Sequence, residues 1–286
     1  MKALNLGCGR RYQTDWTNID FRSGSEFVSA HDLSKGIPAL DESFDLVYHS
    51  HLLEHFTKDD AEVFIQECFR VLRPQGILRV VVPDLEQVTR AYLTALEHAS
   101  GGSTEWCNHY DWMIIELLDQ SVRTHPRGKM GDYLSAQHIP NQDFVIERLG
   151  TEAKKLTDSR KQESCAAKRV NSFVLNPLLE NAIKPIYRFL RHSSYRREWL
   201  LKSILGEEFE TLELGRFRKS GEIHQWMYDC FSLKRLLEQN GFVEVIQRTA
   251  IESYVPDWST FNLDTEPDGS IYKPDSLFME AIKPDA

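Results

Sequence analysis

Short apolar runs alternate with helical patterns through the first 83 residues, and only a few folds accommodate such an alternation. The apolar runs are Ala3–Leu6, Asn18–Phe21, Phe44–Tyr48 and Ile77–Val82. Strands that are separated by helical crossovers pair side by side in a parallel sheet with helices on its faces. The pattern therefore predicts an α/β fold built on a doubly wound, mostly parallel sheet.

The best supported helix of this part spans residues 59–72. Its apolar residues fall on one face, and they are Phe64, Cys68, Phe69 and Leu72. Asp59 or Asp60 can cap the first turn, and Pro74 with Gly76 predicts the end of the helix. The apolar run that follows is then a buried strand.

A second unit of helix and strand appears near the end of the chain. Ser232 can cap a helix with an apolar face, and Gly241 predicts its end. The residues of that face are Leu233, Leu236 and Leu237. Phe242–Ile246 reads as the next strand, and Ser276–Ile282 as the last one.

The predicted sheet is thus split in the sequence by a long insert. Residues 1–84 and 221–286 form the core, and residues 85–220 form the insert. Helical patterns dominate the insert, at Leu85–His98, Glu105–Val122 and Leu178–Leu205. Inserts at the carboxyl ends of sheet strands commonly shape a substrate pocket, so we expect the insert to form the substrate site.

The charge balance argues against a nucleic-acid partner. The chain has 286 residues, with 34 basic and 43 acidic side chains, for a formal net charge of −9. Proteins that bind nucleic acids usually present a strongly basic face. The oligomeric state is left open by the sequence.

Cysteine usage and hydropathy indicate a cytoplasmic protein. The five cysteines are scattered and include no CxxC pair, which argues against a disulfide framework or a thiolate zinc site. No apolar run reaches the roughly 20 residues of a membrane-spanning helix. The opening MKALNLGCG also lacks the layout of a signal peptide.

A glycine turn and an acidic residue follow the first two predicted strands. Gly7 and Gly9 flank Cys8, and Asp20 ends the next strand. Glycines let the backbone approach a ligand, and a strand-end carboxylate can accept both hydroxyls of a ribose. A dinucleotide site is disfavoured, because its G-x-G-x-x-G pattern and the spacing of about 20 residues to the acid are both missing.

The chain resembles the class I S-adenosylmethionine-dependent methyltransferases, which have Rossmann-like sheets. The motifs that carry the resemblance are LNLGCG at 4–9, NID at 18–20, HDL at 31–33, SFDLVYHSHLLEHF at 43–56 and RVLRPQGILRVVVPDLE at 70–86. GEIHQWMYD at 221–229 and SLKRLLEQNGF at 232–242 resemble a subgroup associated with sugar or cell-surface polysaccharide pathways.

The resemblance implies S-adenosylmethionine as the cofactor and assigns residues to its parts. Gly7, Cys8 and Gly9 would line the methionine and ribose, and Asp20 would hold the ribose hydroxyls. Asp32 and Leu33 would lie at the adenine edge. Tyr48, His49 and Ser50 would lie beside the sulfonium.

Two departures from the family pattern concern the loop after the glycine turn. Arg10 and Arg11 stand where a third glycine is usual, and only ten residues separate Gly9 from Asp20. The first crossover helix is therefore expected to be short or absent. Either arginine could pair with the carboxylate of the cofactor, and two solvated surface arginines are the alternative.

His51, Glu54 and His55 also match H-x-x-E-H, the inverted zinc-protease motif. A zinc hydrolase would explain neither the glycine turn nor Asp20. We therefore interpret these residues as part of the methyltransferase pocket and expect no metal.

Methyl transfer to a hydroxyl needs alignment of the reactants and a base, and histidine suits that role because it titrates near neutrality. The candidates are His51 first, then His49 and His224, with His109 and His138 of the insert as further contributors. Trp226 and Tyr228 can stack on a sugar or pack in the core. The predicted activity is methyl transfer to a hydroxyl of a sugar or another small molecule, and a non-catalytic cofactor-binding protein is the alternative.

Basic and apolar residues mix in the segment 178–205. The basic ones are Arg188, Arg191, Arg196, Arg197 and Lys202. Such a layout can meet an anionic glycan, a lipid head group or a membrane surface, and an ordinary helix pair with a solvated basic face is the alternative.

Overall fold

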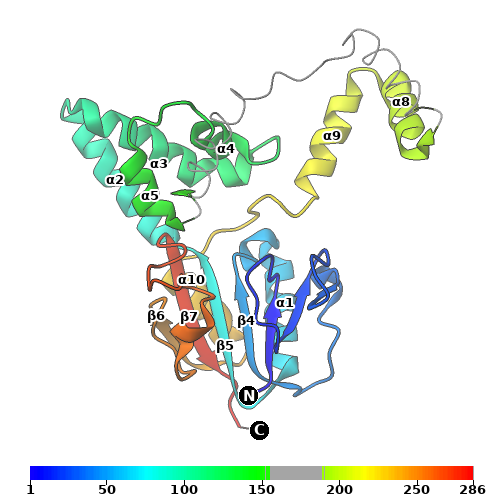
Figure 1. Cartoon of the computed structure of the whole chain (residues 1–286), viewed down its shortest axis with the longest axis vertical. Helices are drawn as coiled ribbons and strands as arrows, with labels where there is room; N and C mark the ends of the chain where they lie inside the picture. The colour runs from blue at the N-terminus through cyan, green and yellow to red at the C-terminus, as the bar shows by residue number, and fades with distance from the viewer. Residues whose placement is uncertain (152, 155–188, 190, 286) are drawn as a thin grey trace, which may run out of the picture.

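The computed structural model describes residues 1–151, 153–154, 189 and 191–285. A seven-stranded sheet forms its centre, in the order β3-β2-β1-β4-β5-β7-β6 (Figure 1). The strands are β1 (Ala3–Leu6), β2 (Thr17–Asp20), β3 (Val28–Ala30), β4 (Phe44–Ser50), β5 (Leu72–Pro83), β6 (Val243–Arg248) and β7 (Ser276–Ile282). β7 runs antiparallel to both of its neighbours, and the pairs from β3 to β5 are parallel. The predicted α/β fold with a mostly parallel, Rossmann-like sheet is confirmed.

The two core helices are present, but they are capped differently from the prediction. Helix α1 (Lys58–Val71) begins after Thr57, whose hydroxyl accepts the backbone N–H of Asp60. Helix α10 (Cys230–Gln239) begins after Asp229, and Ser232 is the third residue of its capping box. The predicted caps were wrong because the residue just before each first turn supplies the side-chain oxygen.

Strand β5 begins directly after α1, so Pro74 and Gly76 do not lie in a separate turn. Gln75 has a φ of 61°, and the pairing with β4 shifts register between Phe44 and Leu46. The helix thus ends before Pro74 and Gly76, as predicted, and these two residues lie in an irregular start of the strand.

One face of the sheet packs on helices α1 and α10. Its core residues include Leu4, Leu6, Val47, Phe64, Ile65, Leu78, Val80, Leu233, Leu237 and Met279. Large apolar side chains from strand and helix faces meet there and exclude water, which is the main stabilising contribution in such a core.

The opposite face is covered by chain from the β6–β7 connection. The short 3-10 helix η3 (Trp258–Phe261) packs there with Trp16, and Tyr48 lies against Trp258 with ring centroids 5.3 Å apart. Besides this apolar packing, polar contacts attach the connection to the sheet.

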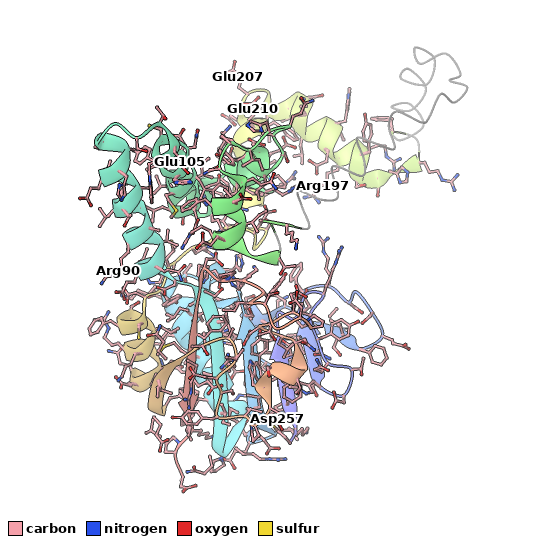
Figure 2. The ribbon with its side chains drawn as sticks, turned by 60° about the vertical axis from the view of Figure 1, so that its left-hand side comes forward. Arg90, Glu105, Arg197, Glu207, Glu210 and Asp257 are labelled. Carbon is pink, nitrogen blue, oxygen red and sulfur yellow. The ribbon has the colours of Figure 1, made fainter. Side chains whose placement is uncertain are left out.

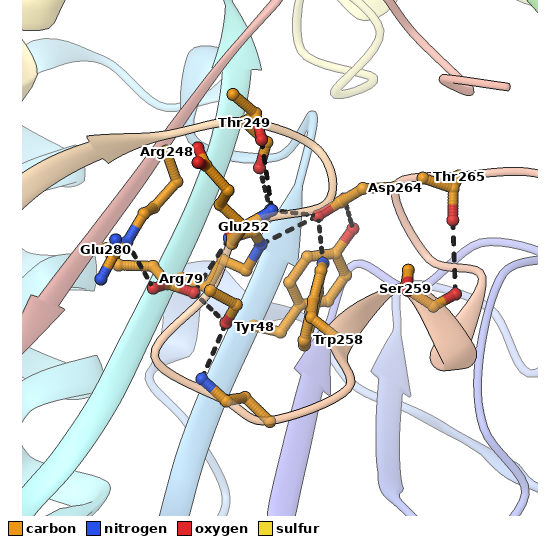
Figure 3. A network of polar contacts seen from close by, with 12 residues as sticks. Tyr48, Arg79, Arg248, Thr249, Glu252, Trp258, Ser259, Asp264, Thr265 and Glu280 are labelled. Atoms are coloured by element: carbon orange, nitrogen blue, oxygen red, sulfur yellow. Dashed lines mark hydrogen bonds and ion pairs between the residues drawn. The ribbon is translucent and has the colours of Figure 1, made fainter. Parts of the chain in front are cut away.

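A buried ion network supplies that attachment (Figure 3). Arg79 of β5 is 0% exposed, and its Nε lies 2.8 Å from Asp264 Oδ2 and its Nη1 2.9 Å from Glu280 Oε1. The Tyr48 hydroxyl donates to Asp264 Oδ1 at 2.6 Å, and the Trp258 indole donates to Asp264 Oδ2 at 2.8 Å. The guanidinium therefore joins β5, β7 and the connection through paired buried charges.

Helices of the insert lie beyond the carboxyl ends of the parallel strands (Figure 1). They are α2 (Leu85–Ser100), α3 (Thr104–Val122), α4 (Gly128–Leu134), α5 (Gln142–Leu149), α8 (Ser193–Leu205) and α9 (Glu208–Arg218). Figure 2 shows Arg90 and Glu105 on this side of the sheet and Asp257 near the opposite end. The helices predicted at 85–98 and 105–122 are confirmed by α2 and α3.

The predicted helical segment 178–205 is described only in part. Its residues before Ser193 lie outside the described residues, apart from 189, 191 and 192, and the rest forms α8. Arg197 lies on α8, away from the sheet (Figure 2). Within the described part of the chain, no helix combines the length and apolar character needed to cross a bilayer.

Candidate cofactor and active site

A cavity of about 260 Å³ opens where β1 and β4 end. The residues that line it are Asn5, Gly7, Cys8, Gly9, Arg10, Arg11, Tyr48, Ser50, His51, Leu263, Tyr272 and Lys273. β1 pairs with β2 on one side and with β4 on the other, so the strand order reverses direction at this point. Ligands of open α/β sheets bind at such a switch point.

The glycine turn forms one wall of the cavity. Gly7 and Gly9 have φ values of 64° and 53°, which glycine adopts without strain. A Cβ atom on Gly7 would lie 3.0 Å from a methyl carbon of Leu52. A larger residue at this position would therefore be strained and would fill space next to the cavity.

Asp20 lies at the same turn although it belongs to β2. Its Oδ2 accepts the backbone N–H of Gly9 at 2.9 Å, and its Oδ1 accepts the N–H of Arg22 at 3.2 Å.

Burial, and then the charge of Asp20, raises the pKa of the Cys8 thiol to about 12. The cysteine between the glycines is therefore a protonated, unreactive thiol at neutral pH.

The connection between β1 and β2 contains no helix, as the short spacing predicts. Arg11 is held by the β6–β7 connection: it pairs with Glu266 at 3.1 Å and lies over the Tyr272 ring at 3.8 Å. Arg10 is exposed and lines the cavity. Both arginines line the cavity, and Arg10 is the more exposed of the two.

Alternation along β4 separates the candidate residues near the cavity. Tyr48, Ser50 and His51 line it, whereas His49 points to the opposite face, where its ring packs against Phe64 at 5.2 Å. Burial lowers the pKa of His49 to about 4, and within the described residues neither ring nitrogen has a hydrogen-bond partner. The structure therefore places His49 in the core and not on the cavity.

Tyr48 contributes a ring rather than an ionisable group. Burial, and then the neighbouring Asp264 carboxylate, raises the pKa of its hydroxyl well above the usual range. The phenol stays protonated and donates to Asp264, so Tyr48 supports the cavity wall and links it to the ion network.

His51 is the histidine at the cavity. It adopts a left-handed backbone with φ of 51°. Its Nε2 lies 2.9 Å from Ser276 Oγ, and its Nδ1 lies 3.3 Å from Glu54 Oε1. The ring is thus oriented at both nitrogens, with a carboxylate behind it and a hydroxyl at the other side.

His224 approaches the same carboxylate from the far end of the chain. Its backbone N–H donates to Gln120 of α3, and its Nε2 lies 3.9 Å from Glu54 Oε1. Burial lowers the pKa of His224 to about 3, so the imidazole is neutral at neutral pH. The structure therefore brings His51 and His224 together around Glu54.

Asp32 and Leu33 lie after β3 and are not among the residues that line the cavity. Asp32 caps the short 3-10 helix η1 (Leu33–Lys35), and its hydrogen bond from Ser34, followed by that from Lys35, lowers its pKa. Leu33 is buried in the core. A ligand that reached them would extend past Asp20 toward the edge of the sheet.

The remaining aromatic and histidine candidates are dispersed. Tyr228 is buried in the helical core, Trp226 is exposed beside Lys58, and His138 is exposed. His109 stacks on Phe144 within the insert at 4.1 Å. Tyr228 thus follows the core-packing alternative.

Sequence reasoning missed the wall formed by the β6–β7 connection. Leu263, Tyr272 and Lys273 line the cavity opposite the glycine turn. Their positions depend on the attachment of Asp264 to Arg79 and of Glu266 to Arg11, which are contacts between distant residues. No local spacing signals such contacts.

Residues 10–80 match a family model described as a methyltransferase domain. The matched segment covers β2 to most of β5 and is less than half of the chain. No curated protein matches the sequence.

Solved structures with similarity include a SAM-dependent methyltransferase from Archaeoglobus fulgidus, with 11% identity, a TM-score of 0.38, and coverage of 99% of this chain and 86% of that one. A complex of the Haloferax volcanii Trm112 methyltransferase activator with a putative methyltransferase has 9% identity, a TM-score of 0.37, and coverage of 100% and 82%. The [4+2]-cyclase SpnF has 24% identity and a TM-score of 0.24, over 28% of this chain. The chain spans only 38% of that cyclase.

Proposed function

We propose that this protein is an S-adenosylmethionine-dependent methyltransferase. The observation that carries the proposal is the meeting of the glycine turn and Asp20 at the switch point of the sheet, where the carboxylate accepts the N–H of Gly9. The methyltransferase-domain match of residues 10–80 supports it. A carboxylate there can accept the hydroxyls of a ribose, and the bare backbone at Gly7 gives a ligand close access.

The cofactor would be held by the turn and the strand ends. Gly7, Cys8 and Gly9 would line its methionine and ribose, and Asp20 would bind the ribose hydroxyls. Arg10 would pair with its carboxylate, because Arg11 already pairs with Glu266. Asp32 and Leu33 would contact the adenine only if the bound cofactor extends past Asp20. When bound, S-adenosylmethionine supplies an electrophilic methyl group and its own leaving group.

We propose a hydroxyl of a sugar or a related small molecule as the acceptor and His51 as the base. Nδ1 of His51 faces the Glu54 carboxylate, so Nε2 is the nitrogen that would accept a proton. In the structure Nε2 lies 2.9 Å from Ser276 Oγ. An acceptor hydroxyl that replaces Ser276 would donate its proton to the same lone pair. His224 is a secondary candidate, because Glu54 lies between it and His51.

The insert, residues 85–220, would shape the acceptor site above the strand ends, next to the core of residues 1–84 and 221–286. The scattered cysteines favour the cytoplasm as its location. Helix α8 exposes Trp199, Leu200 and Ile204 beside basic residues, which supports contact with an anionic glycan or a membrane surface.

The Asp20→Ala variant tests cofactor binding. We expect a loss of about 1.5 to 3 kcal/mol in binding free energy, the scale of hydrogen bonds to a charged group, which is roughly 10- to 150-fold in Kd. Calorimetric titration with S-adenosylmethionine measures the loss. Asp15→Ala, an exposed aspartate of the same loop, is the matched control and should bind as the unaltered protein does. Equal affinities of the two variants would refute the role of Asp20.

A mass-spectrometric search tests the acceptor. Candidate sugars and small-molecule metabolites are incubated with protein and cofactor, and products that gain a methyl group identify the acceptor class. Cofactor binding without any methylated product across these mixtures would favour a non-catalytic cofactor-binding protein.

A further inference from the structure

A buried carboxylate surrounded by histidines lies behind the cavity wall. Glu54 is 0% exposed; its Oε1 lies 3.3 Å from Nδ1 of His51, and among the described residues its Oε2 has no hydrogen-bond partner. An ionised carboxylate in the interior is costly unless a cation compensates it.

The geometry around this carboxylate matches a ligand set. Glu54, His55 and His224 each offer one ligand atom, and these atoms all lie within 4.8 Å of one another. His55 Nδ1 lies 3.2 Å from the carbonyl oxygen of Ile223, which leaves Nε2 for a metal. Metal-bound imidazoles usually donate their second N–H to such an outer oxygen. Within the described part of the chain, Nδ1 of His224 also lacks a hydrogen-bond partner.

We infer that Glu54, His55 and His224 bind a divalent transition-metal ion and that Zn²⁺ fits best. Two imidazoles and one carboxylate are a known zinc set, which leaves one tetrahedral position for water or another ligand. Bond lengths of about 2.1 Å would place the ligand atoms about 3.4 Å apart. The 3.9 Å between His224 Nε2 and Glu54 Oε1 is close to that separation.

This site differs from the H-x-x-E-H motif of the sequence. The motif pairs His51 with His55, but the structure brings in His224 as the second imidazole, and His51 lies between Glu54 and the cavity. The short segment around His224 is already fastened to the motif, because Gln225 N–H donates to the carbonyl of Glu54 and Gln225 Nε2 donates to that of His55. A metal would add a further link between the chain after β4 and the chain after the insert.

Zinc titration of the full chain tests the inference. Protein freed of metal with a chelator is titrated with zinc sulfate in a calorimeter. We expect one equivalent to bind and the melting temperature to rise with zinc concentration, as linkage requires. Glu54→Gln and His224→Asn should each weaken zinc binding at least 100-fold. His51→Asn and the exposed control His125→Asn should retain one equivalent.

The opposite pattern overturns the inference. The inference is wrong if the unaltered protein shows no saturable zinc binding. It is also wrong if zinc binding is lost in His51→Asn but kept in His224→Asn. Circular dichroism shows whether Glu54→Gln folds. If that variant does not fold, the zinc affinity of His224→Asn tests the inference instead. Asp20→Ala separates the two proposals, because it should bind zinc normally while it loses cofactor affinity.

Discussion

Replacing His51 by asparagine is expected to lower the maximal rate of methyl transfer by about 10²- to 10⁴-fold, the usual contribution of a general base. The imidazole lines the cavity and is held between Glu54 and Ser276, so its loss removes the proton acceptor without opening the cofactor wall. The affinity for S-adenosylmethionine should change little. Steady-state kinetics with the identified acceptor and calorimetry with the cofactor measure the two quantities.

Asparagine is the appropriate replacement because His51 has a positive φ, which asparagine tolerates better than alanine does. His125→Asn serves as the matched control, since His125 is a half-exposed histidine of the insert. A His51→Asn variant with the full rate would exclude His51 as the base, and His224→Asn would then be the next variant to measure.

Arg79→Met is expected to lower the free energy of unfolding by about 3 to 5 kcal/mol, the cost of leaving buried charges unpaired. The substitution removes the cation between Asp264 and Glu280, whose side chains are 1% and 0% exposed. Methionine fills part of the volume, so the loss reports the buried charge of Asp264 more than a cavity; Glu280 keeps its ion pair with Arg248 at 3.3 Å. Urea-induced unfolding, followed by circular dichroism, measures the change.

Arg73→Met is the control for this measurement. Arg73 pairs with Asp45 at 2.6 Å, but both side chains are more than a third exposed, so its removal should cost about 1 kcal/mol or less. If the two methionine variants unfolded at the same urea concentration, the network around Arg79 would not be what fastens the β6–β7 connection to the sheet.

The regular elements of the core could be predicted because their signals are local. The apolar runs of β1, β4 and β7 and the apolar faces of α1 and α10 each lie within a few residues of sequence. The helix caps were less predictable, since Thr57 and Asp229 compete with acceptors only two or three residues away. The cover of the second sheet face depends on Arg79, whose partners lie in the last part of the chain, and periodicity carries no information about such pairs.

The candidate site shows the same division. The glycine turn and Asp20 could be placed together because parallel strands end at one edge of the sheet. The role of His49 could not be judged without the strand register, since a shift of one residue exchanges the core face and the cavity face. The cluster around Glu54 needed the position of His224, which the insert separates from the H-x-x-E-H motif by most of the chain.

The place of β7 between β5 and β6 has a consequence during synthesis. β5 ends at Pro83, and the strand that completes its free edge begins at Ser276. At 5–20 residues per second, about 10 to 40 s of translation separate the two strands. During that interval β5 exposes unpaired backbone groups that can pair with another chain. Arg79 also lacks its two ion-pair partners, Asp264 and Glu280, until they have been synthesised. The edge of β5 therefore stays open to pairing with another chain until β7 has been synthesised.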